Sequence, residues 1–131
     1  MIERSNPPGV HVPPVYHHVT VVQPGRLVLL SGQCPLDADG ALVGEGDVVH
    51  QAEQVAANIE AVLASAGARP EDVVRTTIHV RSDDRGDLVA VWDTLTSSPV
   101  AAFTSACTLV GVAQLGYPGQ LVEVDVTAAL P

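Results

Sequence analysis

The segment 47–66, DVVHQAEQVAANIEAVLASA, is the strongest constraint on what this chain can fold into. Its apolar residues recur at spacings of three and four, as they do on one face of an amphipathic helix: Val48, Ala52, Val55, Ile59 and Val62. Asp47 is suited to cap the first turn, Gly67 to end the last turn, and Pro70 to follow it. The segment therefore predicts a helix that must bury one face against another element.

Short strand-like runs stand on both sides of this helix. They alternate in polarity or are apolar throughout, and they cover 16–22, 27–32, 72–80, 108–113 and 121–128. A weaker helical pattern covers 86–97. The order β-β-α-β-α-β-β requires both hairpins and crossovers, so it predicts an α+β fold with a mixed sheet and two helices on one face.

The N-terminal part of the chain carries turn signals. Residues 1–14 hold four prolines and are expected to form an extended arm. The sequence QPGR at 23–26 predicts a turn, so we expect the strands on either side of it to pair as a hairpin. The second of these strands, 27–32, is apolar on both faces, which predicts burial on both sides.

Alternation in two strands predicts which face of the sheet meets the helices. In the strand at 72–80, one face is expected to carry Val74, Thr76, Ile78 and Val80. In the strand at 121–128, the valines belong against the helices, and the opposite face carries Leu121, Glu123, Asp125 and Thr127. The face away from the helices then meets either water or a second subunit.

Composition favours an oligomer built from a single domain, residues 1–131. The chain is long enough to bury a proper core, and 47% of its residues are hydrophobic while only 16% are charged. The mean hydropathy is +0.27. A small monomer with so few charges would expose apolar patches, and such patches usually mark interfaces.

The charge balance argues against a nucleic-acid partner. The net charge is −9, and the only basic residues besides histidine are six scattered arginines, whereas binding a nucleic-acid backbone requires a basic surface. No apolar run is long enough to span a membrane, and the N-terminus has no apolar signal region, so we expect a cytoplasmic protein. The two cysteines lack zinc-site spacing, so we expect free thiols, no metal and no cofactor.

Four stretches of the chain resemble the RidA family, also called YjgF or L-PSP. They are LLSGQCPLDADGALV, HQAEQVAANIEAVLASAG, EDVVRTTIHV and VGVAQL with the later LVEVDVTA. The resemblance covers residues 15–128 and is carried jointly by S-G-Q-x-P, Q-x-x-x-x-x-x-N-I and V-E-V. It implies a chorismate-mutase-like fold and a homotrimer whose open sheet faces pack around a threefold axis. It also implies a small-molecule cleft between each pair of neighbouring subunits.

The resemblance implies a chemistry, with one departure in this chain. The best-known members hydrolyse 2-imino and enamine acids to keto acids and ammonia, and an arginine before the V-x-V-A-x-L strand grips the substrate carboxylate. Aligned without gaps from VAQL at 112–115, that position is Cys107, and no arginine or lysine follows Arg85. We therefore predict that the chain is not an efficient 2-imino acid deaminase.

Other family positions are kept. Tyr16 matches a tyrosine that lines the cleft, and Gly32 matches a glycine whose backbone faces the ligand. Glu123 matches the glutamate that orients the attacking water, which makes it the predicted acid/base residue. A family asparagine on the second helix has no clear counterpart, although Trp92 falls nearby. Cys34 is expected to pack beside the cleft.

Cys107 is open to two interpretations. As a catalytic nucleophile it would need a lowered pKa and a histidine base. As a small side chain it would line the cleft and contribute to substrate binding. The absence of a cation nearby in the sequence favours the second interpretation.

Three functions are compatible with these residues. The principal prediction is a hydrolase or deaminase-type enzyme that acts on a small metabolite in a cleft at each subunit interface. The alternative is a non-catalytic trimer that binds a small molecule or a partner protein at the same cleft. Endoribonuclease activity, which is sometimes attributed to the family, is disfavoured by the net charge of −9 and the absence of lysine.

Overall fold

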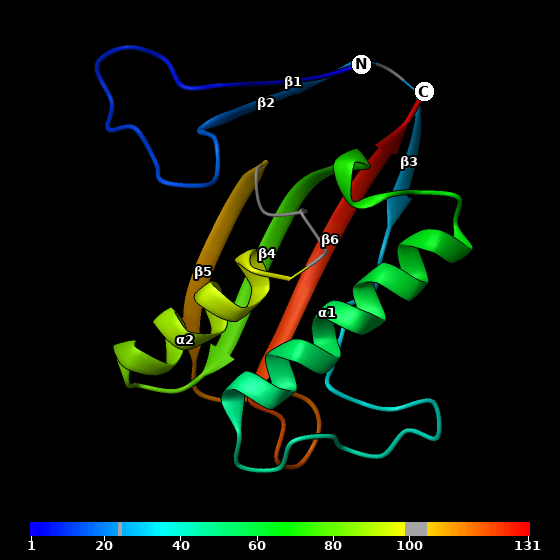
Figure 1. Cartoon of the computed structure of the whole chain (residues 1–131), viewed down its shortest axis with the longest axis vertical. Helices are drawn as coiled ribbons and strands as arrows, with labels where there is room; N and C mark the ends of the chain where they lie inside the picture. The colour runs from blue at the N-terminus through cyan, green and yellow to red at the C-terminus, as the bar shows by residue number, and fades with distance from the viewer. Residues whose placement is uncertain (24, 99–104) are drawn as a thin grey trace.

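The main sheet has four strands in the order β3-β6-β4-β5 (Figure 1). In the computed structural model, which describes residues 1–23, 25–98 and 105–131, these strands are β3 (Arg26–Leu29), β4 (Val73–Arg81), β5 (Ala106–Val112) and β6 (Val122–Leu130). β4 and β5 run parallel, and the other neighbouring strands run antiparallel. The sheet is therefore mixed, as the sequence predicts.

Two helices, α1 (Val48–Ser65) and α2 (Arg85–Thr96), lie across one face of this sheet (Figure 1). A single 3₁₀ turn, η1 (Pro70–Asp72), leads from α1 into β4. The core forms where the helices meet the sheet, and its largest buried residues include Val55, Ile59, Leu63, Ile78 and Leu95. The predicted α+β architecture, with both helices on one face, is confirmed.

Helix α1 begins and ends where its sequence predicts. The Asp47 side chain accepts a hydrogen bond from the backbone N–H of His50 at 3.0 Å, and Gly67 takes a φ of 74° just beyond the helix. Ala52, Val55 and Ile59 of the predicted stripe are fully buried. Near the end of the helix, Leu63 is fully buried whereas Val62 is 36% exposed. Both spacings fit a helical period, so packing against the sheet decides between the two residues.

A register shift near the start of β4 changes which residues face the helices. The pairing of β4 with β6 is irregular between Val73 and Arg75, so Val73 is buried and Val74 is only half-buried. The prediction for Val74 is therefore wrong, because a bulge adds one residue and reverses the alternation before it. Beyond the shift, the predicted residues are fully buried: Thr76, Ile78 and Val80.

The first two strands, β1 (Ile2–Ser5) and β2 (Val19–Val22), form a separate antiparallel sheet. The segment that was expected to be an extended arm therefore contributes a strand. The hairpin predicted between the strands at 16–22 and 27–32 is not formed, because β2 pairs with β1 and β3 pairs with β6. Pro24 of the predicted turn lies outside the described residues.

Side-chain hydrogen bonds attach this small sheet to the main one. The Arg4 guanidinium donates to the Ser105 hydroxyl at 2.7 Å and to the carbonyl oxygens of Glu71 and Val73 at 2.9 and 3.1 Å. These contacts join β1 to the start of β4 and to the residue before β5. A proline-rich segment can therefore be ordered by contacts that its own local sequence does not reveal.

No described helix covers the other face of the main sheet (Figure 1). Leu27 and Leu29 of β3 point to this face and are 64% and 74% exposed, whereas Val28 packs against the core. The predicted burial of this strand on both sides is not met within one subunit. Exposed leucines beside polar side chains are typical of an interface.

Candidate functional site

Glu123 lies on the uncovered face of the sheet, in the inner strand β6. Its neighbours Val122 and Val124 are fully buried on the helix side, so strand alternation turns Glu123 the other way. Its register partner on β4 is His79, whose Nδ1 lies 3.4 Å from the Glu123 carbonyl oxygen. The structure thus places Glu123 on the face that the sequence pattern predicts.

The Glu123 carboxylate is held at one of its two oxygens. Oε1 accepts hydrogen bonds from the Cys34 thiol at 3.1 Å and from the Gln120 side-chain amide at 3.2 Å. No side chain in the described parts of the chain donates to Oε2. The two oxygens of this half-buried carboxylate are therefore chemically different.

Gly32 lies directly against this carboxylate. A Cβ atom at residue 32 would stand 2.7 Å from Glu123 Oε2, closer than real Cβ atoms approach such groups, and 3.0 Å from Asp125 Oδ1. Only glycine therefore allows the backbone and the carboxylate to come this close. We name Gly32, Cys34, Gln120 and Glu123 the Glu123 cluster.

Helix α1 and strand β6 hold the loop that carries Gly32 and Cys34. The backbones of Gln33 and Val124 exchange two hydrogen bonds, at 2.8 and 3.1 Å. The Asn58 side chain donates to the carbonyl oxygens of Cys34 and Leu36, both at 2.9 Å. Asn58 of the Q-x-x-x-x-x-x-N-I pattern is therefore a residue that shapes the loop beside the site.

The opening glutamine of the same pattern, Gln51, ties down the segment that precedes β6. This side chain is fully buried, and its amide donates to the carbonyl oxygens of Gly44 and Gly119 at 3.1 and 3.0 Å. Its oxygen accepts from the backbone N–H of Leu121 at 2.7 Å. Gln51 thereby fixes the turn from which Gln120 reaches Glu123.

Burial and a neighbouring carboxylate keep Cys34 protonated. Burial first, and then the contact with Glu123, raise the pKa of the Cys34 thiol to about 11. A thiol with this pKa is a hydrogen-bond donor near neutral pH and a poor nucleophile.

Cys107 points to the opposite face of the sheet. Its register partner on β4 is the fully buried Thr76, and its side chain packs against the core beneath the helices. Burial raises the pKa of the Cys107 thiol to about 11, although the Arg75 guanidinium opposes this change. Cys107 is therefore a neutral thiol near pH 7, and within one subunit it cannot meet Glu123.

Tyr16 packs in a cluster of rings beside α2. Its ring makes an edge-to-face contact with Trp92 at 6.1 Å between centroids and another with His18 at 6.1 Å. The Tyr16 hydroxyl lies 3.3 Å from His11 Nε2, and the His11 and His18 rings are 4.8 Å apart. We name these four residues the ring cluster.

The structure divides the predicted site residues among three places. Gly32 and Glu123 meet on the uncovered face, Tyr16 meets Trp92 beside α2, and Cys107 packs against the core on the helix side of the sheet. Sequence reasoning missed Gln120 because nothing in its local pattern distinguishes it from a solvated turn residue. Cys34 was expected to pack near the cleft, but its hydrogen bond to Glu123 was not foreseen.

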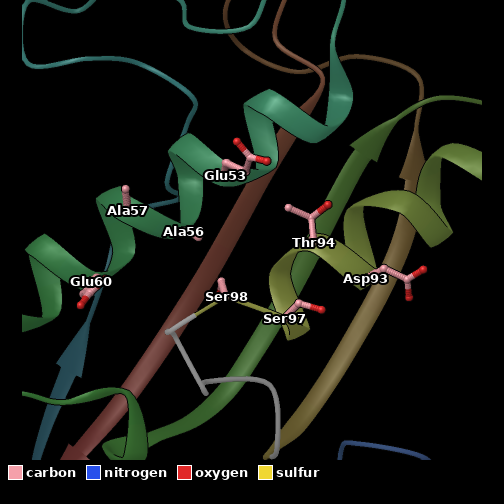
Figure 2. A pocket seen from close by; sticks show the side chains of 8 residues that line it. All are labelled: Glu53, Ala56, Ala57, Glu60, Asp93, Thr94, Ser97 and Ser98. Carbon is pink, nitrogen blue, oxygen red and sulfur yellow. The ribbon is translucent and has the colours of Figure 1, made fainter.

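A cavity of about 630 Å³ between the helices contains none of these residues (Figure 2). Figure 2 shows its lining from α1, from α2 and from the two residues that follow Thr96: Glu53, Ala56, Ala57, Glu60, Asp93, Thr94, Ser97 and Ser98. Among the described residues, its lining offers carboxylates and hydroxyls but no thiol or imidazole. The Glu123 cluster lies on the other side of the sheet and is separate from this cavity.

In the parts of the chain that the structure describes, no group of three or more His, Cys, Asp or Glu residues could hold a metal ion. None of the described helices is long and apolar enough to cross a membrane.

Comparison with known proteins gives consistent matches. A family model described as endoribonuclease L-PSP matches residues 10–130. A RutC family protein of Synechocystis sp. is 35% identical over 119 residues, which cover 90% of this chain and 89% of that protein. A Rid family protein of Yersinia pestis, of unknown function, superposes with a TM-score of 0.87 at 32% identity over 98% of both chains.

Some relatives are named for an activity. A 2-iminobutanoate/2-iminopropanoate deaminase of Salmonella typhimurium is 38% identical over 74 residues, which cover 56% of this chain and 56% of that protein. Matches to four other curated relatives likewise cover 54–56% of those proteins. The chain thus spans about half the length of several curated relatives that it matches.

Proposed function

The chain belongs to the endoribonuclease L-PSP family, the family of the RidA and YjgF proteins, and from this membership we propose that it is a homotrimeric hydrolase of small imines. The reaction joins water to a carbon–nitrogen double bond and releases a carbonyl compound and ammonia. Each site is a small-molecule cleft at the interface between two subunits.

The observation that carries this proposal is the geometry of Glu123. Two donors hold Oε1, while Oε2 lies against the backbone of Gly32 with no described side chain donating to it. A carboxylate fixed in this way is suited to take a proton from a water molecule and to return it to a substrate nitrogen.

The proposed reaction has two steps, and its atoms balance. In the first, Glu123 accepts a proton from water while the water oxygen bonds to the imine carbon, and the C=N electron pair moves to nitrogen. Nitrogen then takes the proton from Glu123, which gives a carbinolamine. In the second step, Glu123 removes the hydroxyl proton, the C=O bond forms, and the C–N bond breaks as ammonia leaves with that proton.

A complete cleft requires two subunits in this proposal. Within one subunit, the Glu123 cluster lies on the uncovered sheet face, and Cys107 lies on the helix-covered face. The exposed leucines of β3 give the uncovered face an apolar surface for a second copy. Because β5 is an edge strand and Cys107 is only half-buried on it, we place Glu123 from one subunit opposite Tyr16 and Cys107 from its neighbour.

The substrate class follows from Cys107. Since its pKa is raised to about 11, this side chain is neutral near pH 7 and lacks the paired N–H donors of a guanidinium. The neighbouring half of the cleft presents the Tyr16 and Trp92 rings. The preferred substrate is therefore an imine without a carboxylate beside the reacting carbon.

The test compares two kinds of imine made in the assay. An amino-acid oxidase supplies carboxylated imines and an amine oxidase supplies uncarboxylated ones, and semicarbazide competes for both. We expect faster hydrolysis of the uncarboxylated imine, and a loss of about 100-fold or more in Glu123→Gln. Glu45→Gln is the matched control, because Glu45 is an exposed glutamate outside the Glu123 cluster.

Two outcomes would contradict the proposal. Equal rates for wild type and Glu123→Gln would remove Glu123 from the reaction. Ligand binding without turnover in both proteins would instead identify a non-catalytic binding trimer.

A further inference from the structure

We propose that Cys34 is a positioning residue for Glu123: its thiol fixes the carboxylate by a hydrogen bond to Oε1 and so leaves Oε2 as the oxygen that acts on water. The consequence for catalysis rests on the proposed function. The contact between the two side chains can be tested without it.

The geometry assigns the thiol proton to Glu123. The Sγ atom lies 3.1 Å from Glu123 Oε1 and 3.6 Å from the carbonyl oxygen of Gly32. A thiol has one proton, and a charged acceptor forms the stronger hydrogen bond. The carboxylate is therefore the preferred acceptor.

The second donor to Glu123 is equally constrained. Gln120 is fully buried, and its amide nitrogen donates both to Glu123 Oε1 and to the carbonyl oxygen of Val122, at 3.2 and 3.1 Å. Its oxygen accepts from the backbone N–H of Tyr117 at 3.1 Å. Both donors thus approach the same carboxylate oxygen from fixed positions.

The backbone of Cys34 is held independently of its thiol. Asn58 binds the Cys34 carbonyl oxygen, and the adjacent Gln33 exchanges two backbone hydrogen bonds with Val124. A substitution of the Cys34 side chain therefore removes the donor without releasing the loop. This separation makes the role of the thiol testable by mutation.

The charges that face the thiol support the same assignment. Burial raises the pKa of the Cys34 thiol most, the Glu123 and Asp125 carboxylates raise it further, and the Gln120 side chain lowers it. The resulting pKa is about 11, so the thiol remains a hydrogen-bond donor near neutral pH.

The first experiment measures the contact alone. Alkylation of Cys34 by iodoacetamide is followed against pH by mass spectrometry, and cleavage after arginine separates Cys34 from Cys107 because Arg75, Arg81 and Arg85 lie between them. In the wild type, we expect the alkylation rate of Cys34 to reach half its maximum near pH 11. In Glu123→Gln, we expect this midpoint to be lower by about one pH unit, while the midpoint for Cys107 is unchanged. An unchanged Cys34 midpoint in Glu123→Gln would overturn the contact.

The second experiment measures the consequence. Cys34→Val keeps an apolar side chain but removes the donor, and Cys34→Ser restores a donor. We expect kcat for imine hydrolysis to fall by about tenfold in Cys34→Val, with KM little changed, and to recover in Cys34→Ser. Thermal unfolding of both variants checks that each is folded.

The outcomes separate this inference from the proposed function. Wild-type kcat in Cys34→Val, together with active wild type, would overturn the positioning role and leave the proposed function standing. An inactive wild type would overturn the proposed function and the catalytic role of Cys34 together. The alkylation midpoints would then still decide whether the hydrogen bond exists.

Discussion

Glu123 and Cys107 lie on opposite faces of the same four-stranded sheet. Glu123 pairs with His79 on the uncovered face, and Cys107 pairs with the buried Thr76 on the helix side. Two residues arranged in this way cannot act on one molecule within one subunit. If both contribute to a site, the site must form between copies of the chain.

The uncovered sheet face is the first target. Leu29→Asp places a charge on a side chain that is 74% exposed in one subunit but buried in the proposed trimer. We expect the variant to sediment as a single subunit and to lose imine hydrolysis. The control is Val89→Asp on the outer surface of α2, where Val89 is 51% exposed, and it should leave the mass and the rate of hydrolysis unchanged. Sedimentation equilibrium measures the mass, and a trimeric Leu29→Asp would contradict the interface.

Gly32→Ala tests the close approach to Glu123. The added Cβ would lie 2.7 Å from Oε2, so the carboxylate must move. We expect kcat to fall about tenfold or more, with little change in the free energy of unfolding, because the atoms that must move are at the end of the flexible Glu123 side chain. Gly116→Ala is the control, because a Cβ there meets nothing within 4 Å. Turnover at the wild-type rate in Gly32→Ala would show that the reaction does not depend on this geometry.

Cys107→Arg tests the substrate class. A guanidinium supplies two parallel donors for a carboxylate, so we expect kcat/KM for 2-iminobutanoate to rise by about tenfold or more. Cys107→Lys is the matched control, since it adds the charge without the paired donors and should gain less. Steady-state kinetics with both variants measure the difference. No gain in Cys107→Arg would indicate that the missing arginine does not limit the substrate range.

The two thiols predict how stability changes at alkaline pH. Each pKa is raised from 9.0 to about 11 in the folded protein, so folding holds these protons more tightly than the unfolded chain does. Their contribution to the free energy of unfolding is complete below about pH 9 and is lost as the pH rises to about 11. Urea unfolding from pH 8 to 10.5 should show this decline in the wild type and a smaller one in a Cys34→Val, Cys107→Val double variant. If the free energy of unfolding fell equally in the wild type and the double variant, the raised pKa values of the two thiols would be contradicted.

Elements with a strong local pattern could be predicted well. Helix α1 follows from the period of its apolar residues and from Asp47 and Gly67 at its ends, and the alternation of β6 turns Glu123 away from the helices as expected. These features depend on residues close together in the chain. The exceptions, Val62 and Val74, arise where packing or a bulge selects between neighbouring positions.

Pairings between distant segments were harder to predict. The turn signal at 23–26 favours a local hairpin, but β2 pairs with β1, and Arg4 attaches β1 to Ser105 and to the start of β4. Loop closure makes the local pairing the natural expectation. The contacts that determine the actual partner come from residues far away in the sequence.

The order of helices and strands from β2 onward and the face to which Glu123 points were determined by the sequence itself, because periodicity and capping act over a few neighbouring residues. The tertiary structure alone decided that Cys34 and Gln120 hold one oxygen of Glu123, and that Cys107 lies on the other side of the sheet. Residues 34 and 123 are separated by most of the chain, and only the packing of α1 and β6 around one loop brings them within a hydrogen bond of each other.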